Sequence, residues 1–475
     1  MKRLLKLTGL WMSLALIVSS CSSNTEKLLK SVPFDAEVVA TANLVELASK
    51  SGVTIEDGRL VLPREYSYIK DNIPAEALKT AGQIAGAIDL ENVVLFGYIN
   101  RNQAYLTAMV KDVELMRSLL KSNGWNSEMN NGLEVWSQST SDYADCLALS
   151  SDETQVWFLD SRKDLTNIDE FEHSRKKNNI LRYSGLADAL TRGNVANLVV
   201  DMNAVKVGLD DYWAAVSFTV NNNAVVLTSK AITTDGNVLE TTELQTIDTD
   251  FLRYMPSNFI CAMAMGVAPG GGFAARMEKS LDESGNNVNR GAFSQIMPFI
   301  KALDGTVAFG FGPKSKSSLM KPESPEQWQA LFMAHMSQAK ANELTEMARS
   351  FFPTSTSSSN GIYTFTSRDF TINYGVVDGN FAVGMGLDLV PNKSNSFTND
   401  FNGKPFAAVF QTPLLSSMVS DTKFDFSIKA AMEVNNSEMR LQINLVGTDA
   451  PIIPTLVSTM PDFFQRYEKA VRSSY

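Results

Sequence analysis

Short apolar runs with partial alternation of apolar and polar residues recur along the chain and predict mainly β-strands. Two runs flank the Asn221–Asn223 tripeptide, which tolerates positive φ, so we expect a hairpin there. The same pattern around Asn435-Asn436 predicts a second hairpin, between Phe426–Val434 and Glu438–Val446. The predicted strands of the N-terminal half are Ala36–Leu44, Asn92–Ile99, Ala104–Val110, Leu133–Ser139, Cys146–Ser150, Gln155–Asp160, Asn197–Met202, Trp213–Val220 and Ala224–Thr233.

Three segments instead carry apolar residues three and four positions apart, which predicts amphipathic helices. They are Pro74–Ile88, Lys111–Asn123 and Gln338–Phe352. Helices therefore interrupt runs of consecutive strands and do not alternate regularly with them. This order favours the α+β class, with mainly antiparallel sheets and a few packed helices.

Short phrases recur in the two halves of the chain in the same order, 213 to 232 positions apart, which predicts two tandem homologous units. We expect the first unit over residues 32–250 and the second over 251–475. The cleft between two such units is the expected place for a protein partner, a glycan or a small ligand. The matched phrases are Val32–Leu44 with Met255–Val267, Phe96-Gly97 with Phe309-Gly310, Gln103–Val110 with Gln329–Met336, Arg117-Ser118 with Arg349-Ser350, Asn131–Trp136 with Asn360–Phe365, and Val220–Asn222 with Val434–Asn436.

The first twenty residues have the layout of a secretory signal peptide. Three basic residues precede an apolar run, Leu7–Val18, that is too short to span a bilayer comfortably, and small residues follow it. Cys21 comes directly after Val-Ser-Ser, which resembles the lipobox of bacterial lipoproteins. The resemblance implies cleavage before Cys21, a diacylglyceryl thioether on its sulfur and acylation of its new amino terminus. The alternative is an ordinary signal peptide with a cysteine near its end. Residues 21–31 are then expected to form a lipidated tether.

The residues after Cys21 indicate in which membrane, and on which side of it, the protein is expected. Ser22 stands where, in the enterobacterial sorting rule, an aspartate would retain a lipoprotein in the inner membrane, so the outer membrane is favoured. Surface-exported lipoproteins of the Bacteroidetes carry an acidic cluster after the cysteine, whereas here only Glu26 follows, so we expect a periplasm-facing position. No other apolar run approaches the ~20 residues of a transmembrane helix.

Net charge limits the possible classes of binding partner, and the cysteine positions indicate the state of the thiols. Without Lys2, Arg3 and Lys6, 39 of the 42 basic residues remain against 52 acidic ones, a net charge of −13. An acidic chain without a basic run is a poor match for nucleic acid and for anionic lipid surfaces, because binding to either depends on phosphate neutralisation. Cys146 and Cys261 lie in apolar strand-like runs and are expected as buried free thiols, although the compartment would also allow a bridge.

Motifs for phosphate or metal binding are incomplete. The glycine-rich stretch Gly266–Lys279 has neither Rossmann nor Walker spacing, so a loop is the better interpretation. His173 and His335 have no ligand partner at the third or fourth position after them. We therefore expect no cofactor and no metal site.

Catalytic motifs are incomplete as well. Ser118 and Lys121 have the Ser-x-x-Lys spacing of penicillin-binding proteins but lack the companion motifs, which favours a solvated helix face. Acidic pairs such as Asp210-Asp211 and Asp248/Asp250 are compatible with glycosidase chemistry, but charged loops are the ordinary interpretation. No catalytic residue is predicted.

The lipobox, the duplicated unit and the Val32–Leu44 opening together resemble a family of Bacteroidetes envelope lipoproteins classified as a domain of unknown function. The resemblance implies an envelope location and supplies no functional residues. The leading hypothesis is a non-enzymatic lipoprotein of the outer membrane that binds or scaffolds envelope partners. The alternatives are a carboxylate-dependent hydrolase of envelope or dietary polymer, and a lipid or lipoprotein carrier.

Overall fold

The computed structural model describes residues 23–459, apart from 57–58, 64–65, 67–74, 140, 142–144, 160, 169–170, 172–177, 206–211, 241–242, 271, 273–296, 316–324, 359, 392–396, 418–425, 436 and 458. The predicted signal peptide, Cys21, His173, Asp210-Asp211 and most of the glycine-rich stretch lie outside the described residues.

The chain forms two compact units, Met1–Leu239 with Ala450–Thr459 and Glu240–Asp449 with Met460–Tyr475. The division at 239/240 precedes the predicted boundary at 250. The sequence placed residues 450–459 in the second unit, but they pack with the first. Ile452 is fully buried, and its backbone N–H donates to the carbonyl oxygen of Asn222 at 2.8 Å.

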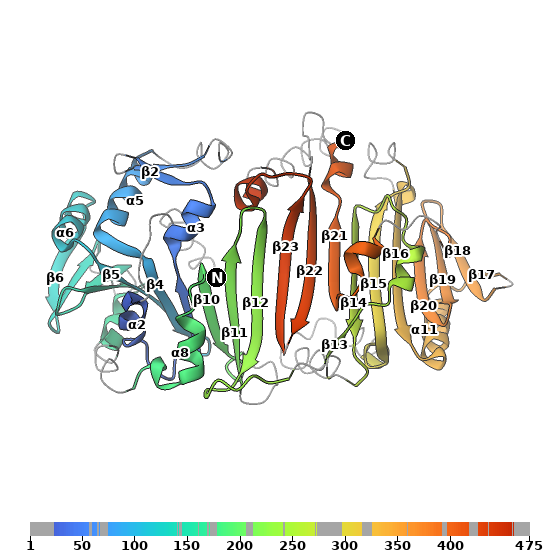
Figure 1. Ribbon diagram of the computed structural model, residues 1–475, viewed down its shortest axis with the longest axis horizontal. Coiled ribbons are helices and arrows are strands. Elements are labelled where there is room, and N and C mark those ends of the chain that lie inside the picture. The colour runs from blue at the N-terminus through green and yellow to red at the C-terminus, as the bar shows by residue number, and fades with distance from the viewer. Residues whose placement is uncertain are drawn as a thin grey trace. The chain divides into compact units, whose positions relative to one another are not determined.

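The first unit contains an antiparallel sheet in which strands distant in sequence lie side by side (Figure 1). Its central pairs join β1 to β4 and β10, and β5 to β4 and β9. The predicted hairpin around Asn221–Asn223 is confirmed as β11–β12. The strand order is β6 (Asn126–Asn130), β7 (Leu133–Ser137), β8 (Cys146–Leu149), β9 (Gln155–Leu159), β5 (Gln103–Val110), β4 (Ile88–Tyr98), β1 (Val38–Ala42), β10 (Ala196–Asp201), β11 (Trp213–Val220) and β12 (Ala224–Ile232).

The second unit repeats this order of antiparallel pairings. The second predicted hairpin is confirmed as β22–β23, and β13 (Leu244–Gln245) pairs with the end of β14. Mainly antiparallel sheets with a few helices confirm the α+β class. The strand order is β17 (Thr356–Ser357), β18 (Ile362–Thr366), β19 (Thr371–Val377), β20 (Asn380–Met385), β16 (Trp328–Met336), β15 (Leu303–Pro313), β14 (Cys261–Val267), β21 (Phe406–Phe410), β22 (Ser427–Asn435) and β23 (Glu438–Val446).

The three predicted helices are confirmed as α5 (Ala75–Ala87), α6 (Val113–Ser122) and α11 (Gln338–Phe351). α6 begins after Asp112, whose side chain accepts a hydrogen bond from the Leu115 backbone N–H and satisfies a free helix donor. No helix among these described segments is long and apolar enough to cross a membrane. The other elements are α2 (Ser23–Leu29), α3 (Leu44–Lys50), α8 (Ser184–Leu190), α12 (Thr398–Phe401), the hairpin of β2 (Thr54–Glu56) and β3 (Arg59–Val61), and the 3-10 helices η2 (Arg162–Asp164), η3 (Ile180–Arg182), η4 (Thr249–Tyr254), η6 (Pro325–Gln327) and η7 (Thr412–Ser417).

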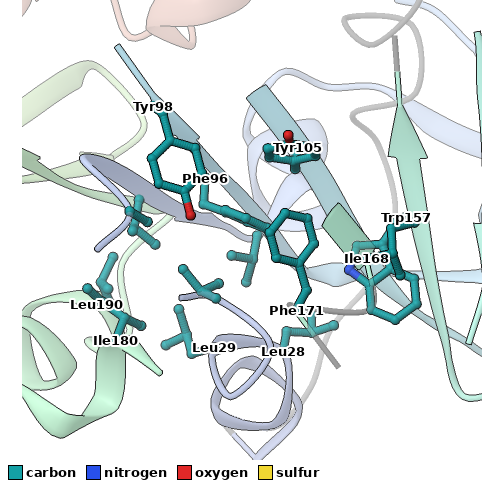
Figure 2. Packing of buried hydrophobic residues seen from close by; sticks show 14 of the residues in the cluster. Leu28, Leu29, Phe96, Tyr98, Tyr105, Trp157, Ile168, Phe171, Ile180 and Leu190 are labelled. Atoms are coloured by element: carbon teal, nitrogen blue, oxygen red, sulfur yellow. The ribbon is translucent and has the colours of Figure 1, made fainter. Parts of the chain in front are cut away.

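The main core of the first unit lies between one face of its sheet and the segments that cover it. Figure 2 shows Phe96 of β4, Tyr105 of β5 and Phe171 at its centre. The Phe96 and Tyr105 rings stack at 5.2 Å, and Phe171 meets both edge-on. Such aromatic contacts add to the stabilisation that burial alone provides.

Helix α2 belongs to this core. Leu28 and Leu29 are fully buried and pack among the residues shown in Figure 2. Residues 23–31, expected as a tether, are therefore part of the folded first unit. The physical reason is the Leu28-Leu29 pair, whose burial removes two large apolar side chains from water.

The main core of the second unit lies on the corresponding face of its own sheet. Phe397 and Phe401 of the α12 segment and Phe251 of η4 are nearly or fully buried there. They cover Ala262 of β14 and Leu331 of β16. This face of the sheet is closed, so a binding surface has to be sought on the other face.

Candidate functional site

The second face of the sheet in the second unit presents a row of large apolar side chains to solvent. Met263 of β14 pairs in register with Phe309 of β15, which pairs with Phe332 of β16. Each of the three side chains is 37% exposed. Because alternate residues of a strand point to opposite faces, their neighbours Ala262, Ala308 and Leu331 face the closed core.

The row extends across the strands on both sides. Val383 of β20 pairs with Phe332, and Ala408 of β21 pairs with Met263. Beyond Ala408 the ladder continues through Ala430 of β22 to Ile443 of β23. We call the row of Val383, Phe332, Phe309, Met263, Ala408, Ala430 and Ile443 the apolar row.

The β22–β23 hairpin has apolar side chains on the face of the apolar row. Its charged side chains point to the opposite face of the sheet, where Lys429 lies 2.6 Å from Asp400 and Lys404 lies 2.5 Å from Glu433. The hydrogen bond from Lys404 and its charge lower the pKa of Glu433. The hairpin therefore separates its charges from the apolar row.

Helix α11 covers only one end of this face. Ala341 and Leu344 pack with Val307 of β15, Ala334 of β16 and Phe381 of β20. These three strand residues form the row next to the apolar row, and Val383 of the apolar row also packs against this cluster, whereas Phe309 and Phe332 are not part of it. An open apolar area begins where the helix packing ends.

The first unit has an equivalent row. Leu95 of β4 pairs with Ala40 of β1 and with Leu106 of β5, and Leu106 pairs with Phe158 of β9. Leu95 is 41% exposed. The adjacent part of this face is covered by α6 and α5 through a second cluster that includes Met116, Leu119, Val93, Ala108 and Val156. Leu106 and Phe158 pack against this cluster, so the exposed part of the row is at Leu95.

Cys261 lies beside the apolar row. It pairs with Phe311 of β15, whose ring lies 6.0 Å from that of Phe309. Burial raises the pKa of the Cys261 thiol. No disulfide joins Cys146 and Cys261; Cys146 is buried, as expected, whereas Cys261 is only partly buried.

Two buried acidic residues, Asp89 and Glu91, lie at an irregularity in the first sheet, where the β4–β5 ladder shifts register between Asp89 and Val93. Asp89 is 4% exposed, and its carboxylate accepts hydrogen bonds from Asn24 at 3.0 Å and from Asn92 at 2.9 Å. Lys111 lies 3.6 Å away. Desolvation first, and then the Asp89 charge, raise the pKa of neighbouring Glu91, with Lys111 opposing. Because both Asp89 oxygens are bonded to protein groups, the pair stabilises the irregular ladder and α2.

The second sheet has an irregularity at the corresponding place, between Leu303 and Val307. Here Nδ1 of His335 lies 2.5 Å from Oδ1 of Asp304. The sequence analysis missed this pair because the two residues are far apart in the chain. Within the described part of the chain, no group of three or more His, Cys, Asp or Glu side chains is arranged to hold a metal ion.

The remaining motif residues have structural roles. Ser118 and Lys121 are both exposed on α6, and Lys121 Nζ lies 6.0 Å from the centre of the Trp136 ring. Asp248 caps η4 by accepting from the Asp250 N–H. Gly266 allows β14 to approach β13, since a Cβ there would lie 2.1 Å from the Gln245 carbonyl oxygen.

In comparisons with known proteins, no family model, no curated protein and no solved structure matches this chain. The exposed apolar row and the N-terminal sequence are therefore the features from which a function can be inferred.

Proposed function

We propose that this protein is a non-enzymatic lipoprotein of the outer membrane, facing the periplasm, that binds an apolar segment of an envelope protein through its apolar row. The observation that carries the proposal is the registered set Met263, Phe309 and Phe332, each 37% exposed on the sheet face opposite the closed core.

The chemistry of the row suits binding. Aromatic and methionine side chains are enriched in the buried centres of protein interfaces, and methionine adapts its shape to different partners. Contiguous apolar patches on a soluble surface commonly mark interaction sites. In the first unit, Leu95 at the equivalent position is 41% exposed, which supports a related but smaller apolar surface there.

We infer that the two units arose by duplication. Three features support this: the same strand order, a ladder irregularity at the same place in β4–β5 and β15–β16, and hairpins of matching register. In the hairpins Val220 pairs with Val225, and Val434 pairs with Met439. Duplication would supply two related binding faces on one anchored chain.

The anchor is the other half of the proposal. The basic start, the short apolar run and the Val-Ser-Ser-Cys sequence support lipid on Cys21. Two or three acyl chains on one residue would hold the protein stably at a membrane without a spanning helix.

The test is photocrosslinking in cells, with benzoylphenylalanine in place of Phe309, Phe332 or Phe351. Phe351, at the end of α11, is the control because it is 62% exposed but lies away from the row. The proposal expects one shared protein adduct from positions 309 and 332 and none from 351. The purified partner should then bind the wild type and lose affinity for Phe309→Asp. Adducts only to lipid would support the carrier alternative, and equal labelling at 351 would contradict a specific surface.

A further inference from the structure

Helix α2 starts immediately after the anchoring residue. Its first residue, Ser23, is two positions from Cys21, and two residues reach at most about 7 Å. The start of α2 is therefore held close to whatever Cys21 is attached to. The inference below rests on the lipid proposed for Cys21.

Side-chain contacts fix α2 to the sheet of the first unit. The Asn24 amide donates to Oδ2 of Asp89 at 3.0 Å, and the Thr25 hydroxyl donates to Oδ1 of Asn92 at 2.6 Å. Leu28 and Leu29 are fully buried in the core. Swinging α2 away would leave buried polar groups unpaired and expose two leucines, so the helix cannot act as a hinge.

These contacts identify one end of the sheet. Asp89 lies at the start of β4, and Lys111, just after the end of β5, reaches the same carboxylate at 3.6 Å. The β4–β5 turn, with Arg101, lies at the other end. The rise of a strand places Tyr98 about 20 Å from Asn92, and Arg101 follows it.

Charge does not distinguish the two ends. Lys27 on α2 and Lys111 are exposed at the anchored end, but so are Glu26 and Asp112. At the turn end Arg101 is exposed, and Glu37 accepts hydrogen bonds from the backbone and side-chain amides of Asn100, at 3.0 and 2.9 Å. The orientation therefore follows from the short connection to Cys21 and from the contacts that fix α2.

We propose that the first unit stands on the bilayer with the end where β4 begins and β5 ends against the lipid headgroups. The partner of this surface is the lipid bilayer that holds Cys21, and the β4–β5 turn faces away from it. The rigid connection through α2 makes the orientation a property of the fold.

The test uses lipidated protein purified from membranes and reconstituted in phosphatidylethanolamine and phosphatidylglycerol vesicles that contain a nickel-chelating lipid. A nitroxide is attached at Lys111→Cys or Arg101→Cys in a Cys261→Ala background, and Lys27→Cys is a second reporter for the anchored end. The background protein without an added cysteine is the blank. We expect relaxation of the nitroxide by nickel to be several-fold stronger at 111 and 27 than at 101.

A matched variant separates the rigid connection from anchoring itself. Inserting about twenty Gly and Ser residues between Ser22 and Ser23 gives a flexible linker and should remove the difference between the two ends. Equal relaxation at 111, 27 and 101 with the native spacing would overturn the orientation while leaving the anchor intact. If Cys21→Ala binds the vesicles as well as the wild type, the proposed lipid anchor fails, and this inference fails with it.

Discussion

Arg117 and Glu134 join α6 to β7 in the first unit, with Nη2 of Arg117 2.6 Å from Oε2 of Glu134. Glu114 and Glu153 also bind this guanidinium, and the hydrogen bonds that Arg117 donates to Glu134 are the main cause of its raised pKa. In the second unit the matching Arg349 lies over the ring of Tyr363, 5.3 Å from its centre. In the second unit, a cation–π contact between Arg349 and Tyr363 thus occupies the position of the Arg117–Glu134 ion pair.

Arg117→Ala should destabilise the first unit by about 1–2 kcal/mol, because Glu134 is mostly buried and would lose its charge-assisted hydrogen bonds. Arg349→Ala, at a more exposed position, should cost less than about 1 kcal/mol. Urea unfolding of both variants measures the difference. Equal losses would contradict the stronger role given to the ion pair.

Leu28→Ala should destabilise the first unit by about 2–4 kcal/mol, because it leaves a cavity among residues that cannot fully close around it. Lys27→Ala, on the exposed side of the same helix, is the control and should have little effect. Thermal unfolding by circular dichroism distinguishes them. A neutral Leu28→Ala would mean that α2 is not part of the core in solution.

Glu91 and Glu433 should contribute to stability with opposite pH dependence. The raised pKa of Glu91 means that the folded state holds its proton more tightly, so stability falls as pH rises from the unfolded value of 4.5 through the folded pKa. The lowered pKa of Glu433 gives stability that is present above 4.5 and is lost as pH falls through the folded pKa.

The measurement is unfolding by urea at a series of pH values between 3 and 7 for wild type, Glu91→Gln and Glu433→Gln. Relative to the wild type, Glu91→Gln should gain stability with rising pH, and Glu433→Gln should lose it. Differences of the same sign for both variants would refute the assigned environments.

Tyr254 should lose its phenolic proton at a higher pH than an ordinary tyrosine. Desolvation and the hydrogen bond to Asp378 raise its pKa to about 12. Asp378 occupies the β19–β20 turn at a φ of 48°, and it also binds Arg253. In difference spectra against Tyr254→Phe, the tyrosinate absorbance of residue 254 should appear near pH 12. Asp378→Asn should lower that midpoint by removing the carboxylate charge, and an unchanged midpoint would argue against this contact.

Local patterns in the sequence predict most elements of the fold. The two Asn turns and the three- and four-residue apolar spacing locate the hairpins and the long helices correctly. The match of Gln103 with Gln329 agrees with the ladders, in which Tyr105 and Leu331 occupy corresponding buried positions.

The match of Phe96 with Phe309 is wrong by one residue. Val39 pairs with Phe96, whereas the corresponding Ala262 pairs with Gly310. Phe96 is 1% exposed in the core, and Phe309 is 37% exposed on the other face. A shift of one position moves a side chain to the opposite face of the sheet, and similarity between two short sequence segments does not reveal such a shift.

The apolar row could not be located from the sequence, although near-continuous apolar strands such as Ile260–Val267 do signal apolar side chains on both faces. Which face helices cover depends on tertiary packing. The His335–Asp304 pair and the contacts of α2 with Asp89 and Asn92 likewise join residues far apart in sequence. Only the three-dimensional fold brings them together.

The position of Leu28 and Leu29 has a consequence for biosynthesis. These leucines are made early, but their core neighbours Trp157 and Phe171 follow more than a hundred residues later. Contacts between distant residues form slowly because a long loop must close first. Helix α2 must therefore wait, and a truncated chain that starts at Val32 would fold without part of its core.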